Sequence, residues 1–177
     1  RVNSVGEIPP PLKHLLTSAG MDPASYDGPV NGIREAVQQY KRATQAEQGK
    51  DFSELHDEQL TDDYNYLVFP NVTTNMHADD LMLFRHRPHP TDPNKMLFDI
   101  WMFDLIPEGE EWPDLPKHDF RPEGSPRSLG LVIDQDAANL ASVQAGMQSA
   151  GYTGLWLSDQ ELRLRHFHKT ITDFVGA

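Results

Sequence analysis

The chain has 177 residues, 38% of them hydrophobic, and carries 27 acidic against 15 basic side chains, a formal net charge of −12. This length can bury one sizeable core, so we expect one domain or most of one. The negative charge argues against binding to nucleic acid or to an anionic membrane surface. The absence of Cys excludes disulfides, thiolate metal sites and cysteine nucleophiles within this sequence.

Residues 1–30 combine Pro, Gly, Asp and Ser with little hydrophobic periodicity, which indicates extended loop with a short helical turn near residues 12–18. The sequence begins at Arg1 rather than at Met, and it contains neither a signal peptide nor an apolar run of membrane-spanning length. We therefore expect a cytoplasmic protein of which an upstream part is missing.

A helix is predicted over residues 31–49, because apolar side chains recur there at helical spacing and Gly49 closes the pattern. A second, short helix is predicted near residues 52–59. The apolar positions of the first helix are Ile33, Val37, Tyr40 and Ala43.

Three runs rich in aromatic and branched side chains follow, at residues 64–70, 81–87 and 95–105, and each predicts a β-strand. The turn sequence at residues 90–94 contains two prolines and joins the last two runs. These two strands are therefore predicted to form an antiparallel hairpin.

Residues 107–127 are rich in Pro and Glu and predict an exposed loop, followed by helices at about 136–149 and 158–175. The last helix is predicted to open with a capping box. In this motif the Ser158 hydroxyl accepts the backbone N–H of Glu161, and the Glu161 carboxylate accepts the backbone N–H of Ser158. Its apolar stripe consists of Leu164, Phe167, Ile171, Phe174 and Val175.

Antiparallel strands followed by a long amphipathic C-terminal helix predict an α+β fold, with the helix laid against a curved sheet. This architecture can hold an apolar ligand between the sheet and the helix. It does not by itself specify a function.

Asp136 stands at the head of an apolar stripe, since Leu140, Val143 and Met147 follow it at i+4, i+7 and i+11. A carboxylate aimed at a core is costly unless a metal, a cation or several donors meet it. Alternatively, Asp136 lies in the first helical turn and complements the helix dipole, with Asp134 as the N-cap. Spacing alone favours this second interpretation.

Several blocks in sequence order, over about residues 60–175, resemble the Rieske non-haem iron ring-hydroxylating oxygenases. The similarity is to the C-terminal catalytic part of their alpha subunit, a helix-grip domain of the START/Bet v 1-like type, and the first sixty residues match it poorly. The blocks are residues 66–71 with Phe-Pro-Asn, residues 85–93, Asp136 followed by Val-Gln-Ala-Gly at 143–146, Glu161, and Phe167 with His168.

The resemblance implies an Fe(II) held by two His and one carboxylate, with open positions for dioxygen. The position that matches the carboxylate ligand is Asp136, and Gln135 stands where relatives often have an acidic residue. The two His ligands and the Rieske domain with its 2Fe-2S cluster have no counterpart in residues 1–177. We therefore expect the chain to be the C-terminal part of a catalytic domain, inactive alone.

The implied function is that of a terminal oxygenase component in aromatic hydrocarbon catabolism, which inserts oxygen from O2 into an aromatic or other apolar substrate. The implied partners are a ferredoxin or reductase that donates electrons, and further subunits in an alpha trimer or an alpha3beta3 assembly. His89 matches a position where some relatives have a His that lines the substrate pocket.

The other histidines carry weaker signals. His86, near the end of a strand, is expected to be solvated or paired. His166 and His168 are two positions apart on the last helix and cannot face one metal. His168 falls within the apolar stripe, so we expect a core histidine there.

Two other functions compete with the oxygenase. The same architecture serves non-catalytic carriers of apolar ligands, which a chain with one of three iron ligands could be. The small beta subunits of these oxygenases have a related curved sheet, but they lack the Val-Gln-x-Gly helix with its leading Asp, which favours the alpha subunit.

Overall fold

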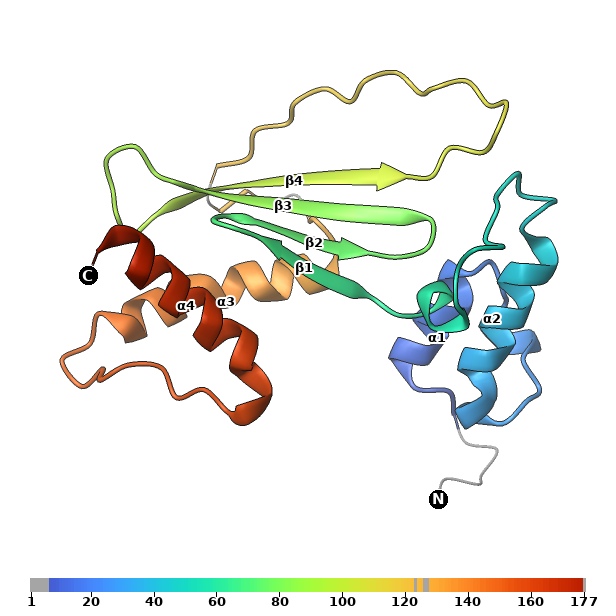
Figure 1. Ribbon diagram of the computed structural model, residues 1–177, viewed down its shortest axis with the longest axis horizontal. Helices are drawn as coiled ribbons and strands as arrows, with labels where there is room; N and C mark the ends of the chain where they lie inside the picture. The colour runs from blue at the N-terminus through green and yellow to red at the C-terminus, as the bar shows by residue number, and fades with distance from the viewer. Residues whose placement is uncertain (1–6, 123, 126–127, 177) are drawn as a thin grey trace. The chain divides into compact units, whose positions relative to one another are not determined.

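The computed structural model describes residues 7–122, 124–125 and 128–176 (Figure 1). The chain divides into two compact units, Arg1–Asp114 and Leu115–Ala177. Within the described ranges, no helix has the length and apolarity needed to cross a lipid bilayer.

The first unit begins with two helices, α1 (Pro10–Ser18) and α2 (Ile33–Thr44). Pro10 suits the first position of α1 because its missing N–H would have no partner there. Between the helices lie two 3-10 turns, η1 (Pro23–Ser25) and η2 (Val30–Gly32). Both predicted helices are confirmed, although α2 ends five residues before Gly49 and a turn covers the remainder.

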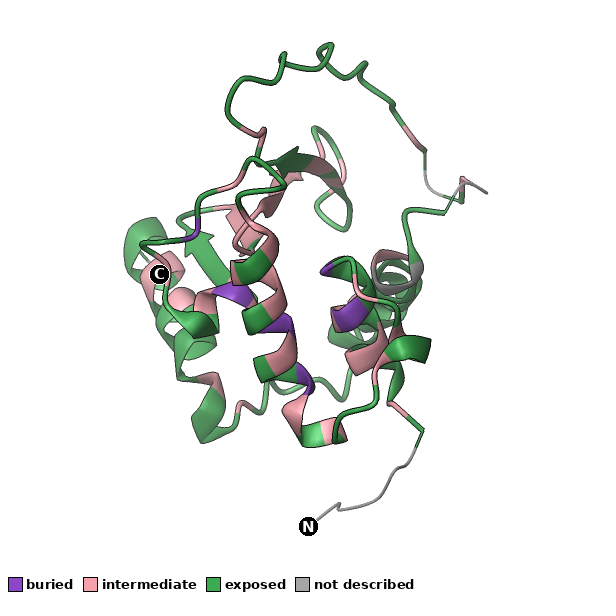
Figure 2. Ribbon diagram, turned by 90° about the vertical axis from the view of Figure 1, so that its right-hand side faces the viewer, coloured by how far each residue is buried: buried purple, intermediate pink, exposed green. Residues whose placement is uncertain are grey.

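These helices hold the best-buried side chains of the described residues (Figure 2). Leu16 from α1 packs against Ile33 and Val37 from α2, and all three are fully buried. Burial of large side chains such as these stabilises a fold by about 1.5–3 kcal/mol each. Phe52 and Leu60 complete the set of fully buried large side chains.

The short helix predicted over residues 52–59 is wrong, because only the 3-10 turn η3 (Asp57–Leu60) forms there. Side chains of α2 satisfy the preceding backbone groups instead. Gln45 Oε1 accepts the Phe52 N–H at 2.6 Å, and Arg42 donates to the carbonyls of Phe52 and Leu55 at 3.2 and 2.7 Å.

The rest of the first unit is a four-stranded antiparallel meander of order β1-β2-β3-β4. Its strands are β1 (Tyr64–Val68), β2 (Val72–Met76), β3 (Asp80–Pro88) and β4 (Met96–Asp104). The predicted β3–β4 hairpin is confirmed. The sequence analysis missed β2, whose central Thr-Thr-Asn interrupts the apolar pattern although its Val and Thr residues favour strands.

The register gives the sheet two chemically different faces. Directly paired residues project to the same side, and successive residues alternate between the sides. We call the first side the ring face; its middle carries Asn65, Leu67, Thr73, Asn75, Met82, Phe84, His86, Phe98, Ile100 and Met102, and the paired Asp80 and Asp104 lie at its end. We call the second side the charged face; its middle carries Tyr66, Val68, Val72, Thr74, Leu83, Arg85, Arg87, Leu97, Asp99 and Trp101.

Asp79, in the turn between β2 and β3, ties the sheet to the helical part of the same unit. Its carboxylate accepts hydrogen bonds from Lys41 of α2 at 3.1 Å and from Lys50 at 2.6 Å. The three side chains are only 13–19% exposed. Burial raises the pKa of Asp79, but the two lysines outweigh that effect, so the pKa lies below its usual value.

The second unit contains α3 (Leu131–Met147), the 3-10 turn η4 (Asp159–Glu161) and α4 (Leu162–Val175). The capping box before the last helix is confirmed, and the Ser158 N–H donates to Glu161 Oε2 at 2.6 Å. Helix α4 ends at Gly176, whose φ of 73° suits glycine. In the apolar stripe of α4, Leu164, Phe174 and Val175 are exposed by 45–77%.

Helix α3 begins five residues earlier than the predicted start at residue 136. The chain enters it through Gly130, with a φ of 99°. The loop predicted over residues 107–127 is confirmed for its described part; residues 123 and 126–127 lie outside the described residues. An open antiparallel sheet combined with separate helices makes the chain α+β, as predicted, with the elements in the order of a helix-grip catalytic domain.

Candidate active-site elements

Asp136 lies in the second turn of α3, and its side chain is exposed. Leu140, Val143 and Met147 share its side of the helix at the predicted spacing, each between 44% and 48% exposed. No described residue donates a hydrogen bond to the Asp136 carboxylate or forms an ion pair with it. The carboxylate is therefore available to a ligand on an apolar helix face.

Asp134 has a different environment, although it is only two residues away. Its carboxylate accepts hydrogen bonds from the Ser128 hydroxyl and from the Leu129 N–H, the latter at 2.9 Å. These bonds, led by the one from Ser128, hold the pKa of Asp134 below its usual value. The predicted N-cap role of Asp134 is wrong, because Gly130 is the N-cap and Asp134 reaches back from the first turn.

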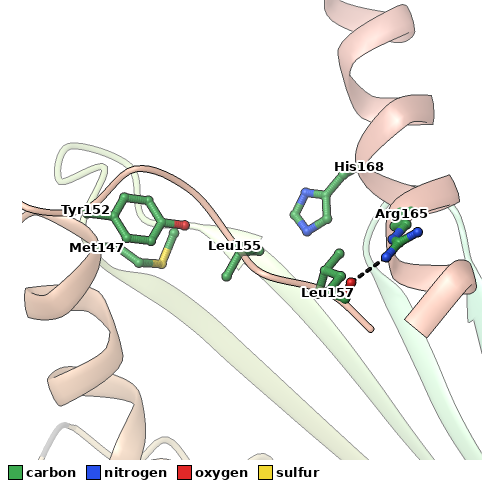
Figure 3. A pocket seen from close by; sticks show the side chains of 6 residues that line it. All are labelled: Met147, Tyr152, Leu155, Leu157, Arg165 and His168. Carbon is green, nitrogen blue, oxygen red and sulfur yellow. Dashed lines mark hydrogen bonds between the residues drawn. The ribbon is translucent and has the colours of Figure 1, made fainter. Parts of the chain in front are cut away.

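An open groove of about 530 Å³ lies in the second unit, next to the C-terminal end of α3 (Figure 3). Met147, Tyr152, Leu155 and Leu157 supply its apolar lining. Arg165 and His168 come from α4, and Arg165 donates a hydrogen bond to the carbonyl of Leu157. The groove combines an apolar lining with two cationic or polar side chains.

His168 is therefore not the core histidine that the sequence predicted. Its side chain is exposed and points into the groove, while the Phe167 ring lies 5.8 Å away, centroid to centroid. The prediction was wrong because an amphipathic pattern shows which side of a helix is apolar but does not show whether a particular residue on that side is buried.

On the ring face of the sheet, three aromatic rings form a stack. Phe84 and Phe98 lie 5.4 Å apart at 12°, and His86 and Phe98 lie 5.0 Å apart at 24°. His86 Nε2 is also 3.3 Å from the Thr73 hydroxyl on β2. The expected pairing of His86 is therefore confirmed, and its ring is half-buried within this stack.

His89 stabilises the turn that follows β3. Its Nδ1 accepts the backbone N–H groups of Thr91 and Asp92 at 3.3 and 3.1 Å. This use of Nδ1 leaves Nε2 as the ring nitrogen with which His89 can contact a ligand.

The charged face carries an ion cluster in which one carboxylate serves two guanidinium groups. Asp99 accepts from Arg87 Nε at 2.6 Å and Nη2 at 2.9 Å, and from Arg85 Nε at 3.0 Å. These hydrogen bonds, with that of Arg87 the strongest, lower the pKa of Asp99 to about 2 although partial burial opposes the shift. Arg85 also lies over the Trp101 ring at 5.0 Å.

Among the described residues, no three His, Asp or Glu side chains come close enough together to hold a metal ion. An iron site of the facial type needs two imidazole ligands in addition to a carboxylate. The described residues therefore contain no complete site of this type.

A family model for the catalytic domain of the ring-hydroxylating alpha subunit matches residues 14–177. The chain belongs to this family. No curated protein and no solved structure matches the chain. The match begins well before residue 60, so the poor resemblance expected of the first sixty residues is corrected.

Membership in a ring-hydroxylating alpha subunit family makes the chain part of an oxidoreductase family. Members of this family generally use non-haem iron together with a substrate, dioxygen and electron-transfer partners, and they form oligomers.

Proposed function

We propose that the chain is part of the terminal oxygenase component of a ring-hydroxylating system, which inserts oxygen from O2 into an aromatic or other apolar substrate. The observation that carries this proposal is the exposed, unengaged carboxylate of Asp136 on an apolar face of α3, in a chain that the family model matches over residues 14–177. A mononuclear Fe(II) would supply the binding and activation of dioxygen.

In this proposal Asp136 is the carboxylate ligand of the iron. Two His ligands and the 2Fe-2S Rieske cluster come from outside this sequence. Asp136 suits the task because no described side chain competes for its oxygens, whereas Asp134 is already engaged by Ser128 and Leu129. The Asp136 carboxylate would hold the iron to α3, and the iron would supply the site at which dioxygen binds.

The other residues of the chain would bind the substrate and keep water away from it. The ring face supplies an apolar wall, with Phe98, Ile100 and Met102 on β4. His89 would contact the substrate through Nε2, since the turn occupies its Nδ1. We also propose a ferredoxin or reductase as electron donor, an alpha trimer or alpha3beta3 assembly, and a cytoplasmic location.

The experiment is to replace Asp136 in the full-length protein and to measure bound iron, oxygenation and secondary structure. Asp136→Ala should lose iron and activity while the circular dichroism spectrum stays that of the wild type. Asp134→Ala is the matched control, two residues away on the same helix, and should keep its iron. Iron occupancy and turnover unchanged in Asp136→Ala would refute the assignment.

The same measurements decide the alternative of a non-catalytic binding module. The open groove beside α3 and the apolar middle of the ring face are surfaces that a carrier of apolar ligands also needs. A full-length wild-type protein that contains no iron but retains an apolar ligand would favour the carrier.

A further inference from the structure

The two faces of the sheet differ in what can cover them. On the charged face, Arg85, Arg87 and Asp99 form an ion cluster, and covering it would remove three charges from water at a high cost. On the ring face, His86 is the only ionisable side chain between Met82 and His86 and on the strand positions paired with them. Within this stretch, only the ring face can therefore contact an apolar ligand without removing a charged side chain from water.

His86 is the fixed polar group on this wall. Its backbone pairs with Asn71, its Nε2 lies beside the Thr73 hydroxyl, and its ring stacks on Phe98. These contacts hold the imidazole in one orientation. Binding pockets commonly combine an apolar lining with a few precisely placed polar groups that orient the ligand.

The second ring nitrogen, Nδ1, is left for a ligand. No described residue makes a hydrogen bond to it. Among the described residues, no buried side-chain nitrogen or oxygen lacks a hydrogen-bond partner. Since His86 is half-buried and its Nδ1 has no partner, Nδ1 must be accessible from outside the protein.

We propose that His86 is the residue that orients an aromatic substrate with one oxygen substituent, through a hydrogen bond between Nδ1 and that oxygen. The ring of the substrate lies on the apolar wall made by Phe84, Phe98 and Ile100. This inference deepens the proposed oxygenase function and rests on it, because it specifies the substrate class. His86 positions the substrate and takes no part in the reaction itself.

The test compares phenol with toluene, which differ by a hydroxyl in place of a methyl group, in calorimetric titrations of the full-length protein. The readout is the ratio of the toluene dissociation constant to that of phenol. One neutral hydrogen bond corresponds to a ratio change of about three- to tenfold. His86→Phe, which keeps a stacking ring, should lower the ratio by that factor and leave toluene binding unchanged.

His14→Phe, at an exposed position on α1, is the control and should keep the wild-type ratio. A measurement on the wild type alone covers the case in which His86→Phe does not fold: phenol, but not toluene, should shift the 15N resonance of His86 Nδ1. An unchanged ratio in a folded His86→Phe, or the absence of that shift, overturns the role of His86.

The role of His86 and the proposed oxygenase function are contradicted by different results of this experiment. If neither compound binds to an iron-containing wild type, the aromatic substrate class is wrong, and the role of His86 is wrong with it. If both compounds bind and the hydroxyl makes no difference, only His86 is excluded and the oxygenase proposal stands.

Discussion

The side-chain amide of Asn71 donates a 2.8 Å hydrogen bond to the backbone carbonyl of His86, and the His86 N–H donates in return to the Asn71 carbonyl at 2.9 Å. This double contact extends the pairing of β2 with β3 by one residue beyond Val72. Asn71, the Asn of the Phe-Pro-Asn block, therefore fixes the part of β3 that carries His86.

Replacement of Asn71 by Ala should therefore destabilise the sheet at this point. We expect the free energy of unfolding to fall by about 1 kcal/mol, the usual net value of one such hydrogen bond. Urea denaturation measures the change. Asn75→Ala on the same strand is the control, because the Asn75 side chain makes no described hydrogen bond, and it should stay within about 0.5 kcal/mol of the wild type. Equal losses in both variants would contradict the role of Asn71.

Asp99 should make the stability of the sheet depend on pH in the acidic range. Its pKa of about 2 lies below the usual value of 3.8, so the folded state favours the ionised form. The contribution of Asp99 is fully present above about pH 4 and is lost as the pH falls towards 2. Its size is on the order of 1 kcal/mol, because both arginines are more than 40% exposed and solvent screens the pair.

The measurement is the unfolding free energy of wild type and Asp99→Asn at several pH values between 2 and 7. The difference between the two proteins should be constant above about pH 4 and should shrink below it. A difference that stays constant down to pH 2 would show that Asp99 gains nothing from Arg85 and Arg87.

The link between the helical part and the sheet of the first unit depends on Asp79. Asp79→Asn would leave Lys41 and Lys50 without their anion at sites where both are less than 20% exposed. We expect a loss of about 2–3 kcal/mol, as for a hydrogen bond to a charged group. Asp104→Asn, at an exposed position, is the control and should change little. Denaturant titration measures both, and a loss below 0.5 kcal/mol in Asp79→Asn would be the contrary result.

The sequence allowed the elements with strong local patterns to be predicted. The amphipathic helices α2 and α4 and the β3–β4 hairpin follow from spacing and from the turn at residues 90–94. Strand β2 was missed, because its stability comes from pairing with β1 and β3 rather than from its own composition. The early start of α3 was missed for a similar reason, since it depends on contacts between Asp134 and the chain before it.

The residues of the candidate site also divide into those that could be predicted from the sequence and those that could not. Asp136 could be selected because its position relative to the Val-Gln-Ala-Gly block is visible in the sequence. The stack of His86 on Phe98 could not be predicted, because it depends on the register between two strands. An alternation of Phe84 and His86 on β3, opposite Phe98 and Ile100 on β4, was the signal that could have found it.

Asp134 and Asp136 should also differ in their effect on α3 itself. Asp134→Ala removes the acceptor of the Ser128 and Leu129 hydrogen bonds, so the melting temperature should fall and the first turn of α3 should fray. Because the pKa of Asp134 is lowered, this stabilisation is present above its usual value near 3.8 and is lost at lower pH. Asp136→Ala should leave the melting temperature of the metal-free protein unchanged, because no described residue hydrogen-bonds to its carboxylate. Thermal melts at pH 7 and pH 3 measure both effects, and a larger loss in Asp136→Ala than in Asp134→Ala would mean that Asp136 supports the helix rather than a ligand.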